Sequence, residues 1–168
     1  ERGLGRPLDA VFASFEREPV ASASIAQVHF AVVKDAPHAG KDVAVKVLRP
    51  GMREVIERDL EVLDALAALA ARYWTGSERL RPVEVVQEYR KTIIDELDLM
   101  REAANAAQLK RNFAGSALLY VPEVCWDLCR VDVMVMERIH GIQISDMAQL
   151  RAKGTDIRAL AVNGVEIF

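Results

Sequence analysis

The order of the hydrophobic patterns constrains the fold most: short strand-like segments come first, and long helical segments follow. Residues 24–33 begin as an apolar/polar alternation and become continuously apolar, while residues 42–48 alternate strictly. Both patterns are typical of strands. Residues 34–41, between them, contain a proline and a glycine, which favour a tight turn. The first part of the chain therefore predicts an antiparallel hairpin.

Two long helical patterns come next, and a second pair of strand-like segments follows them. Because the strands and helices are segregated along the chain, they predict an α+β fold rather than a series of βαβ units. The expected elements are a helix over 53–74, a loop over 75–82, a second helix over 83–113, two antiparallel strands over 118–129 and 130–141, and further helices after Ser145.

Composition narrows the function classes. The chain has 168 residues, and its apolar fraction of 51% is enough for one domain with a real core. The net charge is −3, and acidic and basic residues are well mixed along the chain, so the sequence does not indicate nucleic-acid binding. Cys125 and Cys129 are too few for a disulfide scaffold and, without a histidine cluster, are a weak metal signal, so we expect reduced cytosolic thiols. The longest apolar run, 63–71, is too short to span a membrane, so this chain is expected to be soluble.

Lys46 is the first candidate for chemistry. In the strand over 42–48 it shares a face with Ala44 and Leu48. A lone lysine in a strand is usually a solvated edge charge. The order of small-residue loop, strand, turn and strand with lysine also matches a nucleotide site in which the loop covers phosphates and the lysine reaches them. The pattern leaves both interpretations open.

A phosphate-binding lysine needs a carboxylate to hold it, and residues 95–109 offer several. Apolar residues occupy most of the circumference of the predicted helix there, so Glu102 is expected to be buried and paired. The alternative is an exposed Glu102 paired with Arg101 or Lys110. Glu96 and Asp98 lie close by, and such acids repel one another unless a cation is near.

Two further stretches show weaker signals. In "VASASIAQVH" (20–29), alanine and serine occupy positions where a phosphate loop normally has glycine. The Cβ of alanine disfavours positive φ, so this loop should be stiffer than a glycine loop. Residues 133–141 form a strand pattern ending at Gly141, and an extended exit from a sheet offers backbone groups to an adenine edge, although most strand ends bind nothing.

The amino-acid sequences of several segments point to one family. "PVASASIAQVH", "VAVKVLRPGM", "YVPEV", "VMERIHGI" and the run over 81–113 occur in this order. Together they resemble the UbiB family of atypical, protein-kinase-like kinases, which support ubiquinone biosynthesis. The resemblance covers essentially the whole chain and implies a kinase-like N-lobe, in which an antiparallel sheet carries two long helices, followed by the start of a helical C-lobe.

The resemblance implies a role for each matching position. Lys46 would contact phosphate with Glu102 as its partner. Glu96 and Asp98 would form the family's Glu-x-Asp element, which engages a Lys-x-Gly-Gln motif upstream of the nucleotide loop. The remaining nucleotide-binding positions would be the alanine-rich loop, Ala21, Ser22, Ala23, Ser24, Ile25, Ala26 and Gln27, and the hinge residues Met136, Glu137 and Ile139.

The sequence also departs from the family pattern. No Lys-x-Gly-Gln stretch precedes Ala21, and nothing after Gly141 resembles the catalytic-loop Asp and Asn or the metal-binding Asp-x-Gly. The family's C-terminal hydrophobic segments are absent too. We therefore expect one incomplete domain, with the N-lobe and hinge over about 8–141 and the start of the C-lobe over 142–168. Such a piece, which holds no metal ligands, should be inactive alone.

The resemblance implies the ATP-binding part of an atypical kinase or ATPase. ATP or ADP would be the ligand, with Mg²⁺ held by residues outside this chain. The complete protein would act on or beside ubiquinone-pathway lipids and proteins at the cytoplasmic face of the bacterial inner membrane, reached through the missing segments. The alternatives are a pseudokinase scaffold that uses nucleotide as a conformational ligand, and a helical interaction domain that binds no nucleotide.

Overall fold

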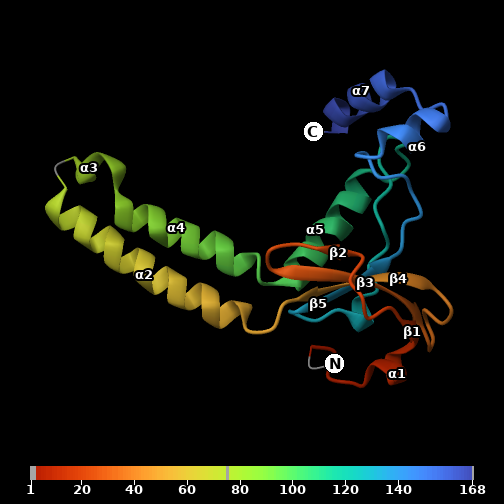
Figure 1. Cartoon of the computed structure of the whole chain (residues 1–168), viewed down its shortest axis with the longest axis horizontal. Coiled ribbons are helices and arrows are strands. Elements are labelled where there is room, and N and C mark those ends of the chain that lie inside the picture. Colours follow the sequence, from red (N-terminus) through yellow and green to blue (C-terminus); the bar gives the residue numbers. More distant parts are fainter. Residues whose placement is uncertain (1–2, 75, 168) are drawn as a thin grey trace.

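The computed structural model describes residues 3–74 and 76–167, which form an antiparallel sheet, a projecting helical arm, four further α-helices and one 3₁₀ helix (Figure 1). The α+β class expected from the sequence is confirmed. The elements are α1 (Leu8–Val11), β1 (Phe12–Phe15), β2 (Ala21–Ser22), β3 (Ala26–Val33), β4 (Asp42–Leu48), α2 (Met52–Tyr73), α3 (Ser77–Leu80), α4 (Pro82–Asp95), α5 (Leu99–Asn112), the 3₁₀ helix η1 (Trp126–Leu128), β5 (Val133–Glu137), α6 (Met147–Ala152) and α7 (Ile157–Ile167).

The sheet has the order β1-β3-β4-β5, with β2 paired to the other end of β3, and every pairing is antiparallel. The predicted hairpin of two strands is confirmed, although β3 begins at Ala26 rather than at residue 24. Lys46 lies in the middle of the sheet, since it is paired with Val28 on β3 and with Met134 on β5. Neither β1 nor β2 was expected from the hydrophobic pattern.

The core lies between the sheet and α5. Val43, Val45 and Val135 are fully buried on adjacent strands, and Leu99 and Ala103 on α5 belong to the same cluster. Residues four apart on a helix lie on one face, so α5 contacts the sheet through a narrow apolar stripe. This packing fixes the position of α5 relative to β4, on which Lys46 lies.

Helices α2 and α4 form an antiparallel arm that projects from the sheet, with α3 at its tip (Figure 1). Leu60 and Ala67 of α2 are buried, and their spacing of seven residues places them on one face of the helix. The predicted helix over 53–74 is confirmed. The loop expected over 75–82 is partly wrong, because α3 lies within it; Thr75 falls outside the described residues.

The single helix expected over 83–113 is wrong, since α4 ends at Asp95 and α5 begins at Leu99. Leu97 and Leu99 are both buried, whereas residues two apart on one helix point about 200° apart. The break lets both side chains reach the core. Asp98 then starts the new helix, because its carboxylate accepts a hydrogen bond from the Met100 N–H at 2.9 Å.

The strand expected over 118–129 is also wrong. This segment is irregular, with one isolated bridge between Val124 and Met136 and the 3₁₀ turn η1. Cys125, Leu128 and Cys129 are all buried, and this spacing fits a turn rather than the two-residue period of a strand. Only β5 remains of the two predicted strands, and it is shorter than the expected range of 130–141.

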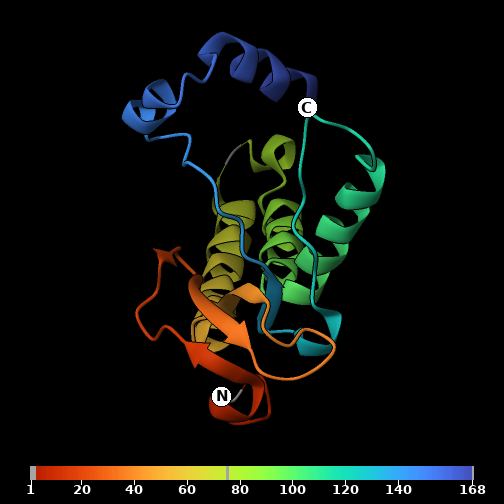
Figure 2. The same cartoon turned by 90° about the vertical axis from the view of Figure 1, so that its right-hand side faces the viewer.

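Helices α6 and α7 lie at the opposite end of the molecule from the N-terminus (Figure 2). They confirm the helical pattern expected after Ser145, although the last residue of that pattern, Phe168, falls outside the described residues. Across residues 3–74 and 76–167, no helix combines the length and apolar character needed to cross a bilayer.

Candidate functional site

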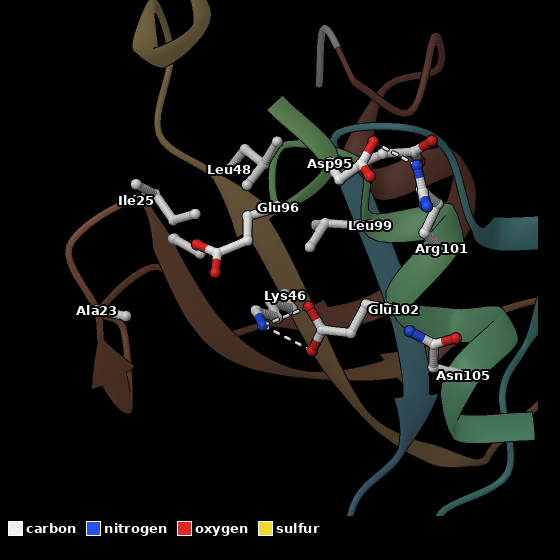
Figure 3. Close-up of a pocket in the computed structure, with 12 residues that line it drawn as sticks. Ala23, Ile25, Lys46, Leu48, Asp95, Glu96, Leu99, Arg101, Glu102 and Asn105 are labelled. Atoms are coloured by element: carbon white, nitrogen blue, oxygen red, sulfur yellow. Dashed lines mark hydrogen bonds and ion pairs between the residues drawn. The ribbon is translucent and has the colours of Figure 1, made fainter. Parts of the chain in front are cut away.

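The structure joins Lys46 and Glu102, which are 56 residues apart in the sequence. The Lys46 Nζ donates to both carboxylate oxygens of Glu102 at 2.7 Å (Figure 3). The pairing predicted for these two residues is therefore present in the structure. Because Lys46 is on β4 and Glu102 is in the first turn of α5, the ion pair links the sheet to this helix.

The expectation that Glu102 is buried is wrong. Its side chain is 45% exposed and that of Lys46 is 25% exposed. The sequence pattern overestimated the apolar surface of α5, because much of that surface is alanine, and only Leu99 and Ala103 on α5 are fully buried. Glu102 therefore lies on the flank of the helix, at the edge of the core.

The ion pair lines an open pocket of about 470 Å³ beneath the β2–β3 hairpin (Figure 3). This volume is within the range of about 300–1,000 Å³ typical of small-molecule sites. Three parts of the chain enclose it: the hairpin, β4, and the junction of α4 with α5. The lining residues are Ala23, Ile25, Ala26, Lys46, Leu48, Asp95, Glu96, Asp98, Leu99, Arg101, Glu102 and Asn105.

Both cationic side chains in this lining are paired. Lys46 contacts Glu102, and Arg101 contacts Asp95. Glu96 lies at the centre of the close-up (Figure 3), and within the described part of the chain its side chain has no hydrogen bond or ion pair. Asp98 is used as the cap of α5. The pocket thus has an excess of negative charge beside its lysine, and this excess would repel an anionic ligand unless a cation accompanied it.

The alanine-rich loop is a tight hairpin. Ala21 pairs with Val28 and Ser22 with Gln27, and the Ala23 N–H donates to the Ala26 carbonyl oxygen at 2.8 Å. Ser24 lies in the turn between these strands. Arg81 is the only residue other than glycine with positive φ in the described chain, so the hairpin turns without one. Its alanines therefore adopt backbone conformations open to any L-residue.

The predicted hinge residues lie apart from this lining. Met136 is half-buried against the core, whereas Ile139 is exposed just beyond β5. The backbone N–H of Glu137 donates to the Glu123 carbonyl oxygen at 2.8 Å, so this N–H is not free to bind a ligand. The three residues predicted as the hinge lie at or just beyond the end of β5, and none of them lines the pocket.

The Glu137 side chain has a structural role. It accepts hydrogen bonds from the Tyr120 hydroxyl at 2.7 Å and from the Glu123 N–H at 3.1 Å. These bonds lower the pKa of Glu137, with the tyrosine as the larger cause, and the same contact raises the pKa of Tyr120. This side chain anchors the segment over 120–123 to the end of β5.

Sequence reasoning missed several residues at the site. Asn105 and Leu99 line the pocket, and Arg49 braces the hairpin from the end of β4. Their positions depend on the break before α5 and on the strand register, neither of which the hydrophobic pattern contained. For Cys125 and Cys129, burial raises the thiol pKa, to about 11 in Cys125, and both are free. Among the described residues, no cluster of three potential metal ligands occurs.

Comparison with known proteins identifies the family. The whole chain, residues 1–168, matches the ABC1 atypical kinase-like domain. The chain belongs to this family. The chain is 58% identical to the "Probable protein kinase UbiB" of Pseudomonas paraeruginosa over 168 residues, and 56% identical to the proteins of the same name from Aeromonas hydrophila and Azotobacter vinelandii. It spans 31%, 30% and 30% of the lengths of these relatives, respectively.

A solved structure agrees with this assignment. The Rv3197 protein of Mycobacterium tuberculosis, determined as a complex with erythromycin, is 31% identical and superposes with a TM-score of 0.66. The match covers 88% of this chain and 34% of Rv3197. The fold, the family and the resemblance to UbiB seen in the sequence are therefore confirmed, and the relatives are named as probable kinases.

Proposed function

We propose that this chain is the nucleotide-binding part of an atypical kinase or ATPase that binds ATP or ADP in the pocket beneath the β2–β3 hairpin. The observation that carries the proposal is the Lys46–Glu102 ion pair on the wall of that pocket. A lysine on a strand held by a helix carboxylate is the arrangement that positions phosphates in kinases. The ABC1 assignment supports the same chemistry.

Lys46 and the hairpin are the parts of the pocket that would hold the phosphate end of a nucleotide, and a cation bound with the phosphates would offset the carboxylates around them. Lys46 would place a positive charge beside the phosphates, Glu102 would orient its ammonium group, and the hairpin would cover them. Mg²⁺ would supply neutralisation of phosphate charge when it is bound. The described residues contain no set of three metal ligands, so the role assigned here is to hold and orient the phosphates.

The wider setting belongs to the same proposal. The chain's identity to proteins named UbiB and its resemblance to that family support a role in ubiquinone biosynthesis. The complete protein would act on or beside lipid intermediates and partner proteins of that pathway at the cytoplasmic face of the inner membrane. Membrane contact would be made by segments outside this chain.

The test is ligand-dependent thermal stabilisation of the complete protein. ATP or ADP at 100 times its Kd should stabilise the wild type by about 2.7 kcal/mol. Lys46→Ala should lose most of this stabilisation. Lys41→Ala is the matched control, since Lys41 lies just before β4 and its exposed side chain does not line the pocket. This variant should keep the full stabilisation by nucleotide. Equal stabilisation of wild type and Lys46→Ala would contradict the proposal, as would no stabilisation of either.

The same samples separate an enzyme from a scaffold. If the wild type releases phosphate from ATP and Lys46→Ala does not, the result would support an ATPase or kinase. Nucleotide binding without any turnover would instead support the pseudokinase alternative.

A further inference from the structure

Arg49 contacts three of the last four residues before β3. Its backbone N–H donates to the Ile25 carbonyl oxygen at 2.8 Å, which extends the β3–β4 ladder into the turn. Its guanidinium then crosses the hairpin, where Nη2 donates to Ser22 Oγ at 2.7 Å and Nε donates to the Ala23 carbonyl oxygen at 3.3 Å. One side chain thus ties the start of the hairpin to the end of β4.

Arg49 does not line the pocket. Leu48, the residue before it, is part of the lining, whereas Arg49 borders a separate cavity with Pro50 and Gly51. Its side chain also has no carboxylate partner within residues 3–74 and 76–167. The guanidinium therefore acts on the hairpin by hydrogen bonds to neutral oxygens, from outside the pocket.

We infer that Arg49 is a positioning residue that fixes the alanine-rich hairpin over the nucleotide pocket, an inference that rests on the proposed function. Ala23 and Ile25, whose carbonyl groups Arg49 holds, both line the pocket. A hairpin fixed before the ligand arrives loses less conformational entropy on binding. Arg49 thus strengthens nucleotide binding without touching the nucleotide.

The planar guanidinium is essential to this role. It presents several N–H donors in a rigid fork, so Nε and Nη2 can reach two different acceptors at once. A lysine keeps the charge but offers a single ammonium on a flexible stem. Arg49→Lys should therefore rescue the binding only in part.

The experiment measures nucleotide affinity and hairpin protection in the complete protein. Arg49→Met should weaken ADP binding by about tenfold, roughly the entropic cost of ordering one backbone residue of the hairpin when the ligand binds. Hydrogen exchange at residues 21–26 should accelerate in the absence of nucleotide. Arg53→Met is the matched control, since Arg53 pairs with Glu57 on α2 and, among the residues described, has no hydrogen bond or ion pair with the hairpin.

Ser22 provides the readout that separates positioning from a general loss of stability. Ser22→Ala should weaken ADP binding in the wild type but have no further effect in Arg49→Met, because Ser22 acts through the arginine. Equal effects of Ser22→Ala in both backgrounds would overturn the inference, as would unchanged affinity in Arg49→Met. If Arg49→Met does not fold, Ser22→Ala compared in the wild type and in Arg49→Lys carries the same test.

The exchange measurement is independent of the proposed function. If the wild type binds neither ATP nor ADP, the proposed function fails. If hydrogen exchange of the hairpin is no faster in Arg49→Met than in wild type, the arginine does not fix the hairpin, whether or not nucleotide binds.

Discussion

At the scale of single residues, the Lys46–Glu102 pair combines short contacts with substantial exposure. Both carboxylate oxygens of Glu102 lie 2.7 Å from Nζ, yet nearly half of that side chain is accessible. Ion pairs this exposed contribute about 0–1 kcal/mol to stability. The pair therefore does little to hold the fold together, and its consequence is to fix where the ammonium group points.

Ala23 is the residue at which hairpin stiffness can be changed most simply. Its backbone is held by Ala26 and by Arg49. Ala23→Gly removes only the methyl group and admits more backbone conformations. We expect the affinity for ATP or ADP to change, measured by calorimetry on the complete protein. Identical affinities for both nucleotides in wild type and Ala23→Gly would contradict the role given to hairpin stiffness.

Glu137 gives a prediction about pH. Its pKa is lowered below the ordinary value of 4.5, chiefly by the Tyr120 hydroxyl. A carboxyl with a lowered folded-state pKa adds stability above its unfolded pKa, and that stability is lost as the pH falls through the folded value.

Tyr120→Phe should therefore raise the pKa of Glu137 towards 4.5 and reduce this acid-dependent stability. An NMR titration of the carboxyl carbon in both proteins measures the shift. An unchanged pKa would show that the tyrosine is not the main cause.

At the scale of elements, the start of α5 determines where Glu102 lies. Asp98 caps the helix four residues before Glu102. Asp98→Ala should destabilise α5 by about 1 kcal/mol, the usual value of an N-cap. Faster hydrogen exchange in the first turns of α5 in Asp98→Ala than in wild type would show this loss of helix stability.

Asp98→Asn separates this cap from a role of the negative charge. Asparagine keeps the side-chain oxygen acceptor, so it should preserve α5 at nearly wild-type protection. If nucleotide binding or turnover also survives in Asp98→Asn, the carboxylate is needed only as a cap. A loss of function in Asp98→Asn with α5 intact would instead support the charged Glu-x-Asp role that the resemblance implies.

The sequence predicted elements well where a single period dominated. The alternation over 42–48 identified β4 with its lysine face, and the apolar positions over 53–74 identified α2. It failed at the α4–α5 junction, because burial of Leu97 and Leu99 overrides a helical pattern that continues on both sides. It also overestimated the burial of Glu102, since alanine counts as apolar in a pattern but provides little surface to bury a neighbour.

At the scale of the whole molecule, the pocket lies where three segments far apart in the sequence meet. The hairpin, β4 and the α4–α5 junction come together because α5 packs on the sheet through Leu99 and Ala103. The arm of α2 and α4 extends away from this region (Figure 1). A ligand in the pocket should therefore affect the hairpin and the start of α5 and leave the distal arm unchanged.

Hydrogen exchange of the complete protein with and without ADP tests this claim most directly. If the pocket binds the nucleotide, exchange should slow over residues 21–27 and 98–103 and should not change over residues 62–73 of the arm. Lys46→Ala at the same ADP concentration should show none of this protection. Protection confined to the arm, or the same protection in Lys46→Ala as in wild type, would contradict the assignment of this pocket as the nucleotide site.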